Sequence, residues 1–197
     1  HHFYFNLFDM EVEEKEDRVV VHVSGAENVH AHYLGFFVKI EYEIFADGTI
    51  LVNVKGEPYG MVPKVIPRIG VVFEMSKELE RVKWLGRGPL QNYPDSKANA
   101  PISIYEREVN ELNFEYDMPQ ETGNHEDTYA LTLKTAEGES GISVIGSDTF
   151  AFSYHDFTLE NLSAARHRNE LVKSEKKYLY IDYRVRGLGS NSCGPEP

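Results

Sequence analysis

The chain has 197 residues, of which 41% are hydrophobic and 12% aromatic, and its formal net charge is −12. This length suits one large domain or two small ones, and an acidic chain without a Lys/Arg cluster is not expected to bind nucleic acid. No apolar run approaches the ~20 residues of a membrane-spanning helix, so no membrane partner is expected. The single cysteine, Cys193, excludes an internal disulfide and fits a cytoplasmic protein. His1 and His2 are interpreted as a possible remnant of a purification tag.

Short strand-like runs bounded by Gly, Pro, Asn and Asp fill most of the chain, which is typical of antiparallel β proteins. The predicted strands, in chain order, are Arg18–Ser24, Phe37–Ile44, Ile50–Val54, Ile69–Met75, Arg81–Leu85, Ile102–Glu108, Thr128–Lys134, Gly141–Ile145, Thr149–Ser153 and Tyr178–Val185. In each of the clearest runs, apolar and polar residues alternate, so one face is apolar and the other is wet.

The first clear hairpin has a predictable register. A three-residue loop, Ala46–Gly48, pairs Ile44 with Ile50 and Tyr42 with Val52, so that the apolar faces of both strands coincide. A two-residue loop would instead place a valine opposite a glutamate. The sequence therefore predicts the three-residue loop, with its glycine in the left-handed conformation.

Only one helix is predicted. Thr158 can cap its N-terminus, and Leu159, Leu162 and Ala165 recur every three residues behind it. The fold class is therefore mainly β: a two-sheet antiparallel β-sandwich with one short helix, predicted to span 1–197 as a single domain.

The stretch Trp84–Asp95 is the most unusual part of the sequence, because two glycines and a proline end a strand beside several donors and acceptors. Two interpretations are open. In the structural one, the stretch is a buried turn in which Arg87 and Asp95 satisfy backbone groups. In the functional one, the stretch binds a sugar, with an aromatic ring stacked on it. The candidate substrate-binding residues of this stretch are Trp84, Arg87, Asn92 and Tyr93.

This stretch resembles the signature that opens the C-terminal domain of the β-galactosidases of glycoside hydrolase family two, including the separate small chain of two-subunit versions. Gln91 stands where the family usually has Glu, and Lys97 lies near the usual Arg. Other motifs of the family follow the same order along the chain: Pro67-Arg68-Ile69-Gly70, Tyr116 with Pro119–Asn124, Leu162 with Ala165, His167 and Leu171, Ile181-Asp182, and Gly187–Gly189 with Ser192–Pro195.

The resemblance implies a sandwich of the galactose mutarotase-like type that packs over a catalytic (β/α)8 barrel, either a domain of the same chain or a separate large chain. It also implies a galactoside as substrate of the assembled enzyme. For this chain we expect neither a cofactor nor a metal site, while Mg²⁺ and Na⁺ belong to the whole enzyme. His22, His30 and His32 give only a thin zinc signal and are expected at the surface.

A loop near the end of the domain reaches the catalytic pocket in the family. Asn191, Ser192 and Cys193 match that loop, so they are further candidate substrate-binding residues. A relative has Trp where Cys193 stands, and a thiol cannot stack on a sugar as an indole does. The family pattern usually continues beyond Pro197, so the chain is expected to be a fragment of a larger enzyme.

Residues for catalysis are not expected in this chain. Retaining glycoside hydrolysis needs two carboxyl groups about 5 Å apart, and a (β/α)8 barrel needs about 250 residues. Mutarotase-like proton transfer by His125, His167 and Glu121 is an alternative, although His125 is expected in a solvated loop and His167 at a helix end. The sequence thus predicts a non-catalytic domain of a β-galactosidase that hydrolyses terminal β-D-galactosides such as lactose. The main alternative is an autonomous carbohydrate-binding module, and an epimerase is the other.

Overall fold

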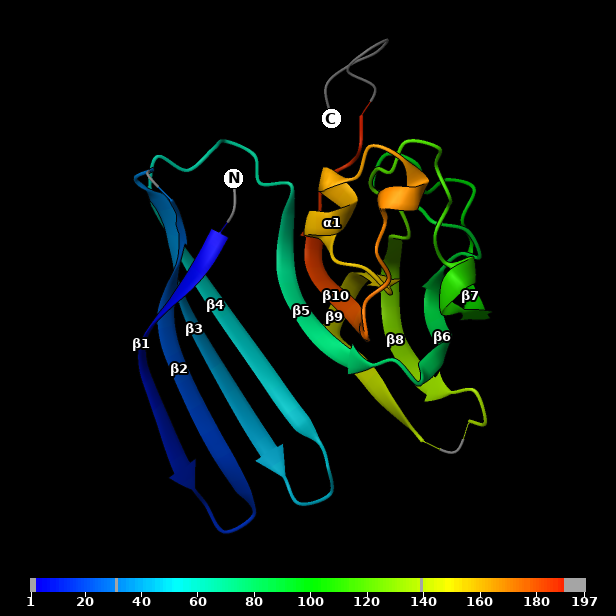
Figure 1. Cartoon of the computed structure of the whole chain (residues 1–197). Helices are drawn as coiled ribbons and strands as arrows, with labels where there is room; N and C mark the ends of the chain where they lie inside the picture. Colours follow the sequence, from blue (N-terminus) through cyan, green and yellow to red (C-terminus); the bar gives the residue numbers. More distant parts are fainter. Residues whose placement is uncertain (1–2, 31, 139, 190–197) are drawn as a thin grey trace. The chain divides into compact units, whose positions relative to one another are not determined.

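The computed structural model describes residues 3–30, 32–138 and 140–189, and the chain divides into two compact units, His1–Val65 and Ile66–Pro197. Each unit is built on one antiparallel sheet (Figure 1). Within the described residues the chain has two sheets and one α-helix, so the predicted mainly β class with two antiparallel sheets is confirmed. Two such sheets are the components of a β-sandwich. The single domain over 1–197 stays a prediction.

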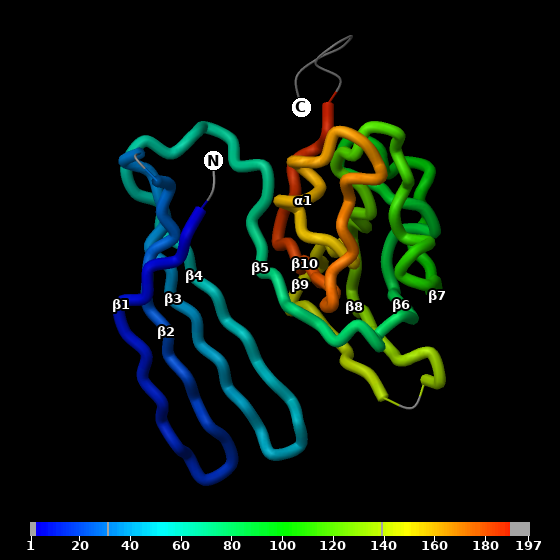
Figure 2. The backbone as a smooth tube through the Cα atoms, in the orientation of Figure 1, coloured from blue at the N-terminus to red at the C-terminus, as the bar shows by residue number. Residues whose placement is uncertain are grey.

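The first unit is a four-stranded meander, and Figure 2 lets the eye follow its path from strand to neighbouring strand. The strands are β1 (Phe3–Glu14), β2 (Arg18–Val29), β3 (Leu34–Phe45) and β4 (Ile50–Gly60). The predicted hairpin register is confirmed, because Ile44 pairs with Ile50 and Tyr42 with Val52. Gly48 has φ +88°, which is the left-handed conformation that the short loop requires.

The register of these four strands divides the sheet into two chemically different faces, because directly paired residues lie on the same side. One face is apolar, with cross-strand rows such as Met10, Val23, Ile40 and Val54. The other face is polar over much of its length, with rows such as Asp9, Ser24, Lys39 and Lys55.

The second unit holds a six-stranded sheet in the order β5-β10-β9-β8-β6-β7. Its strands are β5 (Arg68–Ser76), β6 (Leu79–Arg87), β7 (Ile102–Glu108), β8 (His125–Thr135), β9 (Gly141–His155) and β10 (Lys176–Val185). One face of this sheet supplies a dense core. Its most deeply buried members are Val82, Trp84, Leu131, Leu133, Phe152, Tyr154 and Leu179.

The predicted helix is confirmed as α1 (Leu159–Ala164), and the Thr158 side chain accepts a hydrogen bond from the Asn161 backbone N–H. Two 3₁₀ turns, Val109–Glu111 and Arg168–Glu170, were not expected. No helix in the described part of the chain is both long and apolar enough to cross a bilayer.

Two strand predictions need correction. β1 is a full strand that the sequence did not reveal, because apolar residues occupy both faces of its first half, Phe3–Phe8, and the alternation begins only at Asp9. β9 is one continuous strand, whereas two were predicted on either side of Gly146–Asp148. Irregular register against β8, between His125 and Ala130, lets the strand absorb this turn-like segment.

Candidate functional site

The loop that follows β6 begins in the core. Trp84 is 1% exposed, and its indole N–H donates to the carbonyl oxygen of Arg87 over 2.9 Å. Its ring contacts Tyr105, His125 and Phe152, with centroid distances of 4.8 to 5.7 Å. An indole enclosed in this way has no free face for a sugar, so its substrate-binding role stays a prediction without an exposed ring to support it.

Arg87 ties the loop to two other segments. Its Nε pairs with Asp127 at 2.5 Å, and its Nη1 donates to the carbonyl oxygens of Lys97 and Ala100. Lys97 also reaches Asp127, at 3.1 Å. Partial burial raises the pKa of Asp127, but the hydrogen bonds from the two cations outweigh it and leave that pKa below its usual value. Arg87 therefore satisfies backbone groups, as the structural interpretation of the loop predicts.

The signature loop is joined directly to the segment before β8. The Gln91 side-chain oxygen accepts hydrogen bonds from the Thr122 hydroxyl and the Gly123 backbone N–H, while its amide donates to the Tyr116 hydroxyl. Glu in the same place could accept but not donate, so this network uses the amide that distinguishes the chain from the family pattern.

Asn92 extends the same junction by four hydrogen bonds. Its backbone N–H donates to the Asn124 carbonyl, and its own carbonyl accepts from the Asn124 amide. The Asn92 side chain accepts from the Glu126 backbone N–H and donates to the Leu90 carbonyl. Because Asn92 is almost fully buried, these contacts fix two loops to each other and leave its side chain no atom for a ligand.

A buried polar cluster lies next to this junction. Arg68 pairs with Glu121 at 3.0 Å and with Asp182 at 3.3 Å, and the Tyr93 hydroxyl lies 3.5 Å from the same Glu121. Burial raises the pKa of Asp182 to about 7, although Arg68 opposes the rise. Burial, followed by the charge of Glu121, also raises the pKa of Tyr93. Tyr93 is 2% exposed, so its ring belongs to the core as the Trp84 ring does.

Two histidines are buried in the second unit. His125 stacks on Phe152 and its Nδ1 bonds the Gly123 carbonyl oxygen, so the expectation of a solvated loop was wrong. His155 is also fully buried, and neither ring nitrogen has a hydrogen-bond partner among the described residues. Burial lowers the pKa of His125 to about 4 and that of His155 to about 3.

The residues considered for epimerase chemistry have different surroundings. His167 precedes a 3₁₀ turn, as a helix-end residue should, and pairs with Glu170 at an exposed position. His125 lies in the core, and Glu121 is engaged by Arg68. Sequence reasoning missed the polar cluster itself, although Arg68 and Asp182 both occur in recognised motifs. The sequence signal for it was Asp182, a carboxylate in the middle of a predicted strand, because such a carboxylate needs a charged or hydrogen-bonding partner if it is buried.

The end of the described chain is anchored by Asp95. Its carboxylate accepts a hydrogen bond from the Gly189 backbone N–H at 2.6 Å. A Cβ atom on Gly187 would lie 2.6 Å from the Asp95 carboxyl carbon, so glycine is required for this close approach. The candidates Asn191, Ser192 and Cys193 lie outside the described residues. The structure thus places Gly187 and Gly189, the last described glycines before that segment, against Asp95 of the signature loop.

The histidines of the first unit lie at the surface and form no metal site within the described residues. In the parts of the chain that the structure describes, no three His, Cys, Asp or Glu side chains converge to hold a metal ion. His22 is exposed and pairs with Glu41 at 3.4 Å, and His30 and His32 are exposed as well.

Comparison with known proteins decides the family. The chain matches the family described as beta galactosidase small chain over residues 3–197. This chain belongs to the β-galactosidase small-chain family. It is 34% identical over 178 residues to the β-galactosidase of Kluyveromyces lactis, a match that covers 89% of this chain and 17% of that protein. The β-galactosidases of Actinobacillus pleuropneumoniae and Vibrio cholerae are 30% and 31% identical, over 98% and 95% of this chain.

The resemblance that the ordered motifs indicated is therefore confirmed. This small-chain homologue spans only 17 to 18% of the length of these three curated relatives. It thus corresponds to a small part of a larger β-galactosidase.

Proposed function

We propose that this chain is the non-catalytic C-terminal domain of a family-two β-galactosidase that hydrolyses terminal β-D-galactosides such as lactose. The observation that carries the proposal is the match to the small-chain family over residues 3–197, together with the small share of each relative that the chain covers. In this proposal the catalytic (β/α)8 barrel, with any Mg²⁺ or Na⁺, belongs to the rest of a cytoplasmic enzyme.

The carboxyl groups of the buried cluster support the non-catalytic assignment. Retaining hydrolysis needs an acid/base and a nucleophile on either side of a bound sugar. Glu121 and Asp182 share the guanidinium of Arg68, and Asp182 is 1% exposed. Because both carboxyl groups are paired with one guanidinium, they neutralise a partly buried cation, which is a structural role and not that of a free acid and nucleophile.

We further propose that the domain contributes the segment after Gly189 to the entrance of the active site, where Asn191 and Ser192 hydrogen-bond a sugar hydroxyl and Cys193 lines the path. The hydrogen bond between Asp95 and Gly189 supports this role, since it fixes the last described residue before that segment at the signature loop. In this proposal the signature loop acts on the substrate indirectly: the hydrogen bonds of Arg87, Gln91 and Asn92 fix the loop that carries Asp95.

The assay for this proposal uses a chromogenic β-galactoside. The isolated 197-residue chain should show no hydrolysis above background, the remainder of the enzyme should show little, and the two together should recover activity. Robust hydrolysis by the isolated chain would remove the non-catalytic assignment. Activity of the remainder that is unchanged by the chain would remove its contribution to the active site.

A further inference from the structure

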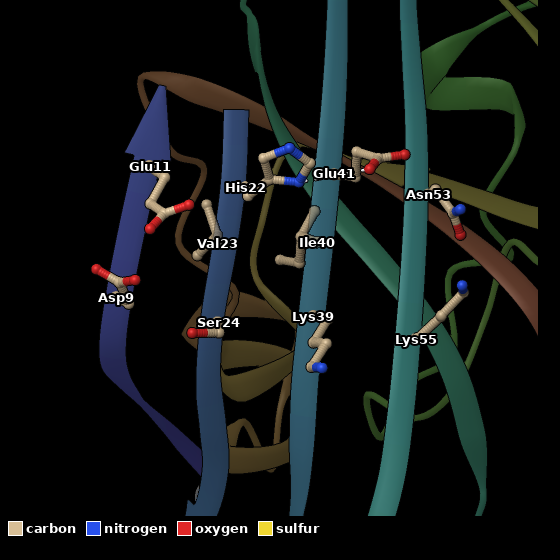
Figure 3. A pocket seen from close by; sticks show the side chains of 10 residues that line it. All are labelled: Asp9, Glu11, His22, Val23, Ser24, Lys39, Ile40, Glu41, Asn53 and Lys55. Atoms are coloured by element: carbon tan, nitrogen blue, oxygen red, sulfur yellow. Dashed lines mark ion pairs between the residues drawn. The ribbon is translucent and has the colours of Figure 1, made fainter. Parts of the chain in front are cut away.

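The polar face of the four-stranded sheet has no part in the site described above. It is made by the rows Asp9, Ser24, Lys39, Lys55 and Glu11, His22, Glu41, Asn53, which the register places side by side. These residues line a shallow depression of about 360 Å³, and Figure 3 shows that they come from all four strands. A volume of this size lies within the range of small-molecule sites.

The lining side chains are available to a ligand. His22 pairs with Glu41, but within the described residues Ser24, Lys39, Asn53 and Lys55 make no side-chain hydrogen bond or ion pair. The depression therefore presents ammonium donors, carboxylate acceptors, and a hydroxyl and an amide that can do both. A sugar hydroxyl can donate and accept hydrogen bonds at the same time. It therefore fits this mixture of donors and acceptors better than an anionic or a cationic group does.

An aromatic strip borders the depression on the same face. Phe37 lies two residues before Lys39 on β3, and its ring is 4.6 Å from that of Tyr59 and 6.4 Å from that of Phe8. Phe8 is 57% exposed and Phe37 is 48% exposed. Exposed aromatic rings that cluster on one face of a sheet are typical of a surface that contacts a partner, and pyranose rings stack on such surfaces.

The spacing between the strip and the polar rows suits linked sugar rings. Two residues along a strand advance about 7 Å, so Phe37, Lys39 and Glu41 form three steps on one line. A ring stacked on Phe37 would place its neighbour over the Lys39 row and a third near the Glu41 row. The register thus provides a stacking platform followed by successive hydrogen-bonding positions.

We propose that this polar face is a binding site for a neutral oligosaccharide of at least two pyranose rings. A nucleic acid or a phosphate would meet the carboxylates of Asp9, Glu11 and Glu41, which repel it. A protein interface would place Lys and Glu side chains at its centre, where such residues are depleted. The proposal goes beyond the role in hydrolysis, and it concerns binding by the chain alone.

The experiment is a titration of the isolated chain with lactose and with a short β-1,4-galactan, followed by calorimetry and by backbone NMR shifts. Saturable binding with a Kd of about 1 mM or tighter is expected, with shifts confined to β1–β4. Phe37→Ala should weaken binding roughly tenfold, because the platform is lost, and Lys39→Ala should weaken it about threefold.

Phe114→Ala is the matched control, since Phe114 is an exposed phenylalanine of the second unit at 60% exposure. It should leave binding unchanged. The proposal is overturned by a lack of saturable binding, or by binding that Phe37→Ala and Lys39→Ala leave intact. Self-association through β1–β4 without sugar would also overturn it, in favour of a protein interface. Circular dichroism of each variant tests whether the fold is kept. Lys55→Ala is a further variant of the polar face that changes no aromatic ring.

Discussion

The two units use β-sheets in opposite ways. In the six-stranded unit, Trp84, Leu131, Phe152 and their neighbours are almost fully removed from water. In the four-stranded unit every residue of β1 is exposed, and among its described residues the buried hydrophobic ones are Val20, Ala26 and Val29. The six-stranded sheet is therefore held by a packed core, and the four-stranded sheet chiefly by its backbone ladder and turns. The difference teaches that similar strand content does not mean similar sources of stability.

The largest expected effect is on the dense core. Trp84→Ala should destabilise the second unit by about 3–5 kcal/mol, because it removes contacts with three rings and leaves a cavity. Val52→Ala, on the exposed face of the first unit, should cost under about 0.5 kcal/mol. Urea titrations followed by NMR signals from both units measure the two values. Equal losses for the two variants would contradict the contrast between the units.

Acid should act selectively on the second unit. His125 and His155 have folded-state pKa values of about 4 and about 3, so below pH 6.5 the unfolded chain binds protons that the folded chain does not. Their contribution is lost as the pH falls. Asp182 opposes them, since its folded pKa of about 7 means that it gains stability as the pH falls from 7 towards 3.8. For these three groups, two protons against one leave a net loss of stability on acidification between pH 6.5 and 4, on the order of 1 kcal/mol per pH unit.

Asp182→Asn sharpens this test. Without the opposing carboxyl, stability should fall more steeply with acid, with roughly twice the slope in the same window. Urea unfolding at half-unit pH steps measures both slopes. A slope that Asp182→Asn leaves unchanged would show that Asp182 titrates alike in the folded and unfolded states.

The smallest effect is expected at the turn between β3 and β4. Gly48→Ala should destabilise the first unit by about 1 kcal/mol, because φ +88° strains any residue with a Cβ while open space surrounds the site. Ala46→Ser, in the same loop, is the control. Amide exchange of β3 and β4 should accelerate in the glycine variant only, and protection that stays equal would mean that the turn does not hold this ladder.

Local signals account for what could be predicted from the sequence. The register at Ala46–Gly48 followed from alternation and one glycine, and the helix start followed from the Thr158 cap. β1 was not predicted because its first half, Phe3–Phe8, has apolar residues on both faces. At the site, the sequence located the loop but did not show that Trp84, Asn92 and Tyr93 are buried. Whether Trp84 is covered depends on rings far along the chain, such as Phe152, and no local pattern encodes that contact.

The buried titratable side chains of the second unit show the same limit. His155 and Asp182 are buried by segments that the fold brings over them, so their altered pKa values have no local signature. The motif order fixed the family because it sums many weak local matches. The geometry within each motif required the tertiary structure.

The most direct test of the central claim is the catalytic efficiency of the whole β-galactosidase carrying Asp95→Ala. If Asp95 holds the segment after Gly189 at the entrance of the active site, kcat/KM for a β-galactoside should fall roughly ten- to hundredfold while Tm changes little. Asp117→Ala, which changes an exposed aspartate without a described partner, is the control and should have wild-type activity. An Asp95→Ala enzyme with unchanged kcat/KM would contradict the account.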